Sequence, residues 1–445
     1  MARTLVRCGR LFDGVSTEIR RNQTLVIEGG NFTSVAATPE IPAAPDDVVI
    51  DHSNEFAMPG LIDVHTHLSY GNARTEEDID IYASMEFRTL RGMYFAPQVL
   101  AAGYTSICAP GGAGMLSSAI RDAIDADLFE GPSVTAAGPY ITSRQGLTDW
   151  YPTWIGVPST SIGRLVKSSD EAIEEVRRQV KDGVDAVKIA LDGIIRRPDG
   201  EHVAAFTQEE TSRMVAEIKR LGKISIAHCR GREATLYAAR AGMDLIFHGS
   251  YMDDEALDAV VKNGCAVSPS LTFLRNTMDF AGENRKAKKD AYQAEYDSAV
   301  EALTKARKAG VRMPTGTDTG FAVTPFGEWH ARELEIYVED LGFDPIEALR
   351  AATSVSATVL RPADKVGRIA AGYRADLLAL KEDPTRNVSI LLDRSKFANI
   401  IREGKPIGIP RRGYEPKKVT DFAMSMFDEL YTRERVAAMR VAQSP

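Results

Sequence analysis

Two histidines, His65 and His67, end an apolar run that begins at Met58. If this run is a strand, its side chains alternate, so both imidazoles point to the same side. Neutral imidazole is a good ligand for zinc and similar ions, and two imidazoles on one strand end supply half of a metal site. By itself the pair fits two polar residues at a strand terminus equally well.

Four more residues with metal or acid–base chemistry fall at the ends of similar apolar runs. They are Lys188, His228, His248 and Asp318. The chain has seven histidines, and four of them lie at these run ends, which is not expected of scattered core or surface histidines. Several neutral nitrogens and a carboxylate suit one or two divalent ions.

Lys188 and Asp318 add chemistry that histidines alone do not supply. A lysine ammonium cannot ligate a metal, but a lysine whose pKa is lowered by burial or nearby cations is nucleophilic. Such a lysine can take up carbon dioxide and become a carbamate that bridges two ions. Asp318 can receive the proton of metal-bound water, whose pKa the ion lowers from roughly 16 to about 7. The hypothesis is hydrolysis by metal-activated hydroxide.

The elements that must position these residues read as strand, loop and helix, repeated from residue 58 onward. The predicted strands are 58–67, 105–109, 133–138, 186–190, 224–228, 245–248, 266–270 and 312–318. Eight strands, each followed by a helix, predict an α/β fold of the TIM (β/α)₈ barrel class, with its active site at the carboxyl ends of the strands. The alternative is an open doubly wound sheet, but neither a G-x-G-x-x-G after the first strand nor a P-loop is present.

Both ends of the chain read as strands without helical periodicity. Residues 1–57 are predicted to form the first part of a β-sandwich, and residues 361–414 the second part, with strands at 365–369, 375–380 and 397–402. The two sets are expected to pair because each would otherwise leave open edges. Residues 58–360 are then the barrel, and residues 415–445 a helical arm or tail.

Bulk properties limit the classes of protein. The net charge of −8 argues against a nucleic-acid binder and against an anionic membrane surface. The four cysteines form no C-x-x-C pair and read as reduced thiols. No secretion signal and no bilayer-spanning run is found. We expect a cytoplasmic enzyme, a homo-oligomer, with a small-molecule substrate.

The motifs together resemble the metal-dependent amidohydrolase superfamily. The matching pieces are Pro59–His67, Val187–Ile189, Ile226–His228, Phe247–Gly249, Gly316–Thr319, Glu347–Thr353, Gly367–Ile369 and Ala375–Leu377. The sequence is similar to the imidazolonepropionase-like branch, which includes prolidase-type dipeptidases, ochratoxin-type amidases, and molinate and phenylurea hydrolases. Segments 247–257 and 327–335 most resemble the last two.

The resemblance implies a ligand set. One ion would take His65, His67, Lys188 and Asp318, and a second would take Lys188 as a carbamate with His228 and His248. Zinc is favoured, with cobalt, manganese or iron as alternatives, and one ion or two are open. Two departures concern the substrate: residues 141–146 lack the Gly-His-Gly-type stretch of prolidase-like members, and Arg230 replaces the second histidine of their H-x-H-G.

The predicted function is hydrolysis of the C–N bond of a small amide, carbamate, urea or N-acyl compound. One alternative is a dipeptidase for Xaa-Pro-type substrates, and another is a cyclic amide hydrolase. A non-enzymatic metal-binding scaffold is disfavoured because both the ligand set and the base are complete.

Three residues are candidates for substrate contact, namely Tyr140, Arg144 and Arg230. A guanidinium at position 230 can bind a carboxylate or carbonyl in two-pronged fashion, or it can pair with a neighbouring loop acid.

Other polar and aromatic residues have plainer interpretations. His330 is predicted to be packed rather than a ligand, and His52 and His202 to lie at the surface. Cys229 follows His228, faces away by strand alternation, and is expected to be inert. The aromatic residues of the loop after the third strand either wall an apolar pocket or pack within the loop; they are Trp150, Tyr151 and Trp154.

Overall fold

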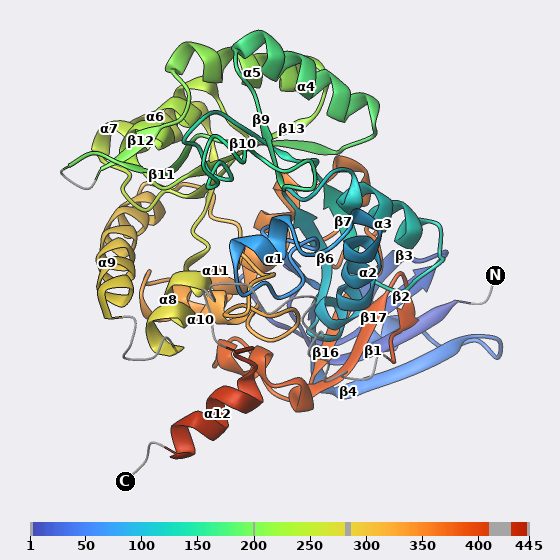
Figure 1. Cartoon of the computed structure of the whole chain (residues 1–445). Coiled ribbons are helices and arrows are strands. Elements are labelled where there is room, and N and C mark those ends of the chain that lie inside the picture. Colours follow the sequence, from blue (N-terminus) through green and yellow to red (C-terminus); the bar gives the residue numbers. More distant parts are fainter. Residues whose placement is uncertain (1–2, 199–200, 281–285, 409–428, 443–445) are drawn as a thin grey trace.

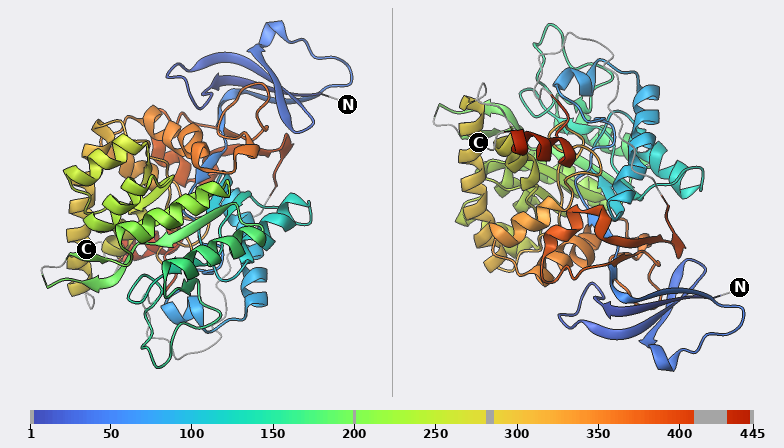
Figure 2. Two further views of the ribbon diagram at one scale, coloured as in Figure 1. Left: turned by 90° about the horizontal axis from the view of Figure 1, so that it is seen from above. Right: turned by 90° about the horizontal axis from the view of Figure 1, so that it is seen from below.

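The computed structural model describes residues 3–198, 201–280, 286–408 and 429–442. Parallel strands lie at the centre with helices outside them, and a separate sheet is built from both ends of the chain (Figure 1). Figure 2 shows the N-terminal strands, in blue, extending from one end of the molecule. Within the described ranges, no helix is long and apolar enough to cross a membrane.

The terminal strands form one seven-stranded sheet in the order β18-β17-β16-β4-β1-β2-β3. Its strands are β1 (Thr4–Leu11), β2 (Arg20–Glu28), β3 (Asn31–Ala37), β4 (Val48–Pro59), β16 (Leu377–Leu380), β17 (Phe397–Arg402) and β18 (Lys405–Pro406). Strand β4 pairs with β1 in parallel and with β16 antiparallel. The predicted pairing of the two ends is therefore confirmed, although the described strands make one sheet rather than the two facing sheets of a sandwich.

One predicted strand of this region is wrong. Residues 365–369 are irregular, and the strand begins only at Leu377. Lys365 and Gly367 have positive φ values of 40° and 78°, which an extended strand does not allow. Val366 and Ile369 are nevertheless buried. The apolar pattern of this segment therefore indicates burial but not an extended backbone.

The central strands form two parallel sheets. The smaller has the order β5-β6-β7 and the larger the order β15-β14-β13-β10-β8-β9. Their strands are β5 (Leu61–Asp63), β6 (Tyr104–Ala109), β7 (Ser133–Ala136), β8 (Tyr140–Thr142), β9 (Gly163–Leu165), β10 (Ala186–Ala190), β13 (Ile224–Cys229), β14 (Leu245–His248) and β15 (Ala266–Ser268). Pro139 has no N–H to donate and separates β7 from β8. Tyr140 therefore begins a second strand, β8, and does not continue β7.

Isolated parallel bridges join these sheets to each other. Ala137 pairs with Ala186 and so connects the end of β7 to β10. The eighth predicted strand, 312–318, is not continuous, because it contains Pro314 and ends at Asp318 with a φ of 57°. It still pairs at its two ends, through the bridges Ala266↔Arg312 and Thr66↔Thr319.

An apolar cluster fills the space between these strands. It contains Ile62, Val64, Cys108, Ala137, Ala186, Ile226, Leu245, Phe247 and Ala266, joined by Val359, Leu360 and Val366. The strand members come from neighbouring strands at alternate positions, as expected of side chains that share one face. Members of this cluster lie one or two residues before His65, Lys188, His228 and His248 in the sequence. The cluster therefore supports the strand ends that carry these four residues.

The helices surround the parallel strands, except that the helix at Glu76–Asp80 lies near the centre of the view and the one at Arg433–Ala442 projects away from the rest of the molecule (Figure 1). They are α1 (Glu76–Asp80), α2 (Met85–Ala101), α3 (Leu116–Asp125), α4 (Ser169–Lys181), α5 (Gln208–Arg220), α6 (Arg232–Ala241), α7 (Asp254–Asn263), α8 (Leu271–Phe280), α9 (Lys286–Lys308), α10 (Arg332–Glu339), α11 (Pro345–Arg350) and α12 (Arg433–Ala442). A capping box of Thr207 and Glu210 opens α5. Of the predicted C-terminal arm, α12 is helical, and residues 415–428 and 443–445 lie outside the described part.

A buried carboxylate ties the first strand to the segment that carries Asp318. Asp63 ends β5, and its Oδ1 accepts hydrogen bonds from the backbone N–H groups of His65 (2.9 Å) and Thr317 (3.2 Å). Its Oδ2 accepts from the Thr317 hydroxyl (2.5 Å) and lies 2.6 Å from Nδ1 of His330. His330 is therefore packed, as predicted, and acts in this network.

We expect Asp63→Asn to lower the free energy of unfolding by about 3 kcal/mol, because the amide would replace one of the two acceptor oxygens with an N–H group that faces buried donors. Urea denaturation measures the change. Asp51→Asn is the matched control, because Asp51 is exposed in β4 and, among the described residues, accepts hydrogen bonds from Ser53 of the same strand alone. Equal stability of the two variants, within about 1 kcal/mol, would contradict the role given to Asp63.

Candidate metal centre and active site

The structure brings the six strand-end residues together. His65 and His67 directly follow β5, Lys188 lies in β10, and His228 lies in β13. His248 ends β14, and Asp318 follows the irregular segment that begins at Arg312. All six side chains are buried, with at most 7% of any of these residues exposed.

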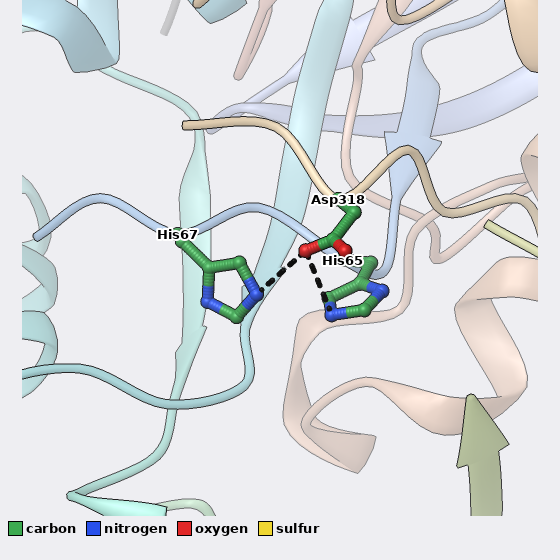
Figure 3. A group of neighbouring side chains, drawn as sticks. All are labelled: His65, His67 and Asp318. Atoms are coloured by element: carbon green, nitrogen blue, oxygen red, sulfur yellow. Dashed lines mark ion pairs between the residues drawn. The ribbon is translucent and has the colours of Figure 1, made fainter. Parts of the chain in front are cut away.

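The first group of donors is His65, His67 and Asp318 (Figure 3). Asp318 Oδ1 lies 3.0 Å from Nε2 of His67 and 3.4 Å from Nε2 of His65. Their ligand atoms all lie within 4.8 Å of one another, which suits three ligands of one ion. The Lys188 amine lies 3.2 Å from Nε2 of His65, so it reaches the same group.

A second pair of donors lies next to the first group. Nε2 of His248 and Nδ1 of His228 are 3.1 Å apart. Two nitrogens that each ligate one tetrahedral zinc lie roughly 3.3 Å apart, so this pair also fits a shared ion. The ring centres of His65 and His248 are 5.5 Å apart, so the two groups are neighbours.

Neighbouring side chains hold the first two imidazoles in place. The ring of His65 stacks on Phe247 with centres 3.7 Å apart, and its Nδ1 lies 2.8 Å from the Ser270 hydroxyl. The ring of His67 stacks on Tyr70, and its Nδ1 donates to the carbonyl oxygen of Gly111 at 3.2 Å. These contacts leave the Nε2 atoms of both rings facing Asp318.

The electrostatics favour neutral imidazoles. Burial lowers the pKa of His65, His228 and His248 well below the ordinary value. The nearby charge of Lys188 lowers all three further, and that of Arg230 lowers the pKa of His228 and His248. Burial would raise the pKa of Asp318, but its close contact with Nε2 of His67 and the nearby positive charges outweigh burial and lower it. Neutral imidazoles and an ionised carboxylate are the forms that bind a metal.

Lys188 lacks the partner that a buried ammonium needs. Burial lowers its pKa to about 7. Among the described residues, no carboxylate lies within ion-pair distance of its amine, which instead lies over the rings of Tyr140 (4.7 Å) and Phe247 (4.4 Å). A large fraction of the amine is therefore unprotonated near neutral pH, the form that can act as a nucleophile.

Two of the six residues have strained backbones. His248 and Asp318 have φ values of 72° and 57°, in a region that non-glycine residues enter at a cost of about 1–3 kcal/mol. The surrounding network fixes Asp318 there, since Thr324 donates to its carbonyl oxygen and Thr317 is held by Asp63. The left-handed backbone at His248 and Asp318 directs their side chains toward the site.

A cavity of about 290 Å³ opens onto five of the six residues, namely His65, His67, Lys188, His228 and Asp318. Tyr140 and Arg230 line it, as does Trp150, which donates to Asp80. Arg144 is exposed and is not part of the lining, and Trp154 is 85% exposed.

Arg230 meets both expectations that its sequence position raised. It lines the cavity, and its guanidinium also pairs with Glu295 on α9 at 2.6 Å. The Tyr140 hydroxyl lies 2.8 Å from that of Tyr70 and 3.3 Å from the His67 ring, so it faces the first group of donors.

The prediction that His52 and His202 lie at the surface is wrong. His52 is 8% exposed within β4 of the terminal sheet and does not line the cavity, and His202 is 4% exposed and lines it. His202 lies in the hairpin of β11 (Asp192–Arg196) and β12 (His202–Ala204), which follows β10. The hairpin brings His202 over the strand ends, so the residue is buried and not exposed to solvent.

Two more buried residues, Asp192 and Cys229, lie beside the site. Asp192, which sequence reasoning missed, is fully buried beside His228, although its place just after β10 was the same signal used for the others. Cys229 is buried, and burial raises the pKa of its thiol, in agreement with an inert cysteine.

The comparisons with known proteins agree with this arrangement. The model of the amidohydrolase family matches residues 56–410. Ochratoxinase of Aspergillus niger is 29% identical over 424 residues, which cover 90% of this chain and 86% of that protein. Its crystal structure has a TM-score of 0.80 at 25% identity and covers 91% of this chain and 95% of that one.

Two further solved structures are similar. A Xaa-Pro dipeptidase with bound methionine has a TM-score of 0.80 at 26% identity, with 91% of this chain and 100% of that one covered. Molinate hydrolase has a TM-score of 0.74 at 20% identity, with 94% and 99% covered, which is a likeness of fold alone. From the matched length and these relatives, the chain belongs to the amidohydrolase family and is a hydrolase that acts on C–N bonds of small amides.

Proposed function

We propose that this hydrolase uses one or two divalent ions, with zinc favoured, held by the six clustered residues. His65, His67, Lys188 and Asp318 would hold one ion, and Lys188 with His228 and His248 a second. The observation that carries the proposal is the burial of neutral imidazole nitrogens around one carboxylate, with donor atoms within 4.8 Å. Such an ion lowers the pKa of water to about 7 and polarises a carbonyl oxygen.

We also propose that the parallel strands close into the (β/α)₈ barrel predicted from the sequence. The bridges Ala137↔Ala186 and Ala266↔Arg312 support this, as does the hydrogen bond from the Val64 N–H to the Thr315 carbonyl oxygen (2.9 Å). Together with the strand orders of the two parallel sheets, these contacts support a ring in which the eighth predicted strand lies beside the first. In this barrel the six residues lie at the carboxyl ends, where active sites of the fold lie. Residues 58–360 would then be the barrel and 1–57 with 361–414 the sheet domain.

The side chains of the chain have distinct roles in the proposed reaction. The Asp318 carboxylate accepts a proton from the attacking water and passes it to the leaving amine. The Tyr140 hydroxyl and the Arg230 guanidinium orient the substrate from the cavity wall, and Trp150 excludes water beside them. Arg144 is left out of these contacts because it is exposed.

The substrate proposed is a small amide, carbamate, urea or N-acyl compound. A dipeptide of the Xaa-Pro type is the second candidate, supported by the 26% identity and 0.80 TM-score to the Xaa-Pro dipeptidase. One nitrogen of the Arg230 guanidinium, Nη1, donates to Glu295. Its other N–H groups suit a carbonyl or carboxylate oxygen of either substrate.

A substrate panel with and without chelator tests the proposal. Purified protein should hydrolyse members of a set of anilides, carbamates, N-acyl amino acids and Xaa-Pro dipeptides. A strong chelator should abolish this turnover and zinc should restore it. Full turnover in protein shown by elemental analysis to be metal-free would refute the metal-dependent mechanism for any substrate.

We expect Asp318→Asn to lower turnover by roughly 100-fold or more, the size of a general-base contribution, because the amide keeps an oxygen ligand but cannot accept the proton. Metal content, measured by elemental analysis, should fall much less than turnover. Near-normal turnover at neutral pH would show that Asp318 is structural and that another group is the base.

We expect Lys188 to be carboxylated in the metal-loaded protein. Its unprotonated amine would attack the carbon of carbon dioxide, forming an N–C bond and releasing one proton to solvent. Nuclear magnetic resonance of protein prepared with ¹³C-bicarbonate should then show a carbamate carbon. Lys188→Ala should remove that signal, one ion and most of the turnover.

Lys181→Ala is the control for this experiment, because Lys181 is exposed near the end of α4. It should keep the carbamate signal, the metal content and the turnover. A wild-type protein with no carbamate signal and with one well-occupied ion would refute carboxylation and leave a mononuclear site.

A further inference from the structure

Asp192 is a buried carboxylate that the proposed reaction does not use. It lies two residues beyond the end of β10 and has no exposed surface. Its Oδ2 accepts hydrogen bonds from the backbone N–H groups of Arg230 (2.7 Å) and Gly231 (2.6 Å). These two residues follow β13 directly, so Oδ2 fixes the chain just beyond His228.

The other oxygen of Asp192 has a different position. Its Oδ1 is buried, has no hydrogen-bond partner among the described residues at normal distance, and lies 3.4 Å from Nε2 of His228. The opposite nitrogen of that ring, Nδ1, lies 3.1 Å from Nε2 of His248. The His228 ring therefore stands between a carboxylate oxygen and a second imidazole.

This arrangement selects one tautomer of His228. A neutral imidazole carries one proton, and the hydrogen bond made by one nitrogen decides which nitrogen is left with a lone pair. An acceptor beside Nε2 favours the proton there and leaves the lone pair of Nδ1 directed toward His248. Carboxylates that accept from the outer nitrogen of a ligating histidine orient the ring and raise its basicity in the same way.

We propose that Asp192 is a positioning residue that holds His228 with its proton on Nε2, so that Nδ1 of His228 and Nε2 of His248 converge on the second ion. The inference rests on the proposed function, because it takes His228 and His248 as ligands. Asp192 does not touch the substrate or the ion. The tight clamp of Oδ2 on two backbone amides keeps Oδ1 in place, whereas the Arg230 side chain next to it is directed to Glu295.

Asp192→Asn separates this role from a merely structural one. With its oxygen on the two backbone N–H groups, the asparagine would present an N–H to Nε2 of His228 and force the proton to Nδ1. The lone pair would then point away from His248. We expect roughly 10- to 100-fold weaker binding of one zinc ion, measured in the purified full-length protein by competition with a chromogenic chelator. The ion at His65, His67 and Asp318 should stay bound.

Asp244→Asn is the matched control. Asp244 accepts from the backbone N–H (2.9 Å) and hydroxyl (2.7 Å) of Ser225 at the opposite end of the same strand, β13. It should keep both zinc affinities. The double variant Asp192→Asn, His228→Ala should bind zinc no more weakly than His228→Ala alone, because the effect of Asp192 acts through that ring.

The outcomes distinguish this inference from the proposed function. Two tightly bound ions in Asp192→Asn would overturn the inference alone, and would mean that Asp192 itself carries a proton and already donates to His228. Further loss of affinity in the double variant would also overturn it, because Asp192 would then act on the fold. A wild-type protein that binds no second ion would refute the second-ion assignment and the inference with it.

Discussion

The geometry of the site depends on one buried carboxylate. Asp63 accepts from the backbone of His65 and from the backbone and hydroxyl of Thr317, and it contacts His330. These groups come from three parts of the chain that are more than 250 residues apart in sequence at the widest. An unpaired carboxylate in this setting would be costly, whereas one with four donors is stabilising and directional. The separation of His65 and Asp318 follows from this network.

Charge balance is the second constraint on the site. Lys188 and Arg230 place positive charge near four imidazoles, and burial removes water that would screen it. The histidines are therefore held neutral, and Lys188 itself gives up its proton near neutral pH. Anionic groups and divalent ions would complete this balance, because a carbamate at Lys188 would add negative charge between cations. The residues that prepare the site for ions thus also prepare the lysine to react.

Much of this architecture was predictable because a strand and its end can be recognised from a short stretch of sequence, as an apolar run that stops at a polar residue. The apolar runs before His228 and His248 end within one residue of strand ends, and the two ends of the chain pair into a sheet. The run before His67 is less regular, because it is divided between β4 and β5 and its strand ends at Asp63. The predictions failed where tertiary packing overrides local pattern. Residues 365–369 are apolar and buried but contain left-handed positions, and His202 is brought over the cavity by a hairpin whose folded position no local period encodes.

The candidate site shows the same division. The type and position of His65, Lys188 and Asp318 pointed to one cluster, because carboxyl ends of parallel strands meet. The partners that orient them did not stand out, because Asp63, Ser270 and Asp192 act through contacts between segments distant in the sequence. The positive φ values of His248 and Asp318 were equally hidden, since only the folded network makes these conformations stable.

The central claim is that strand-end residues of one chain form a metal centre. A crystal of zinc-loaded protein, measured at and just below the zinc absorption edge, tests it most directly. The account predicts anomalous peaks between Nε2 of His65, Nε2 of His67 and Asp318, and between Nδ1 of His228 and Nε2 of His248. Zinc bound only elsewhere on the protein, with these side chains packed against one another and no peak among them, would contradict the account.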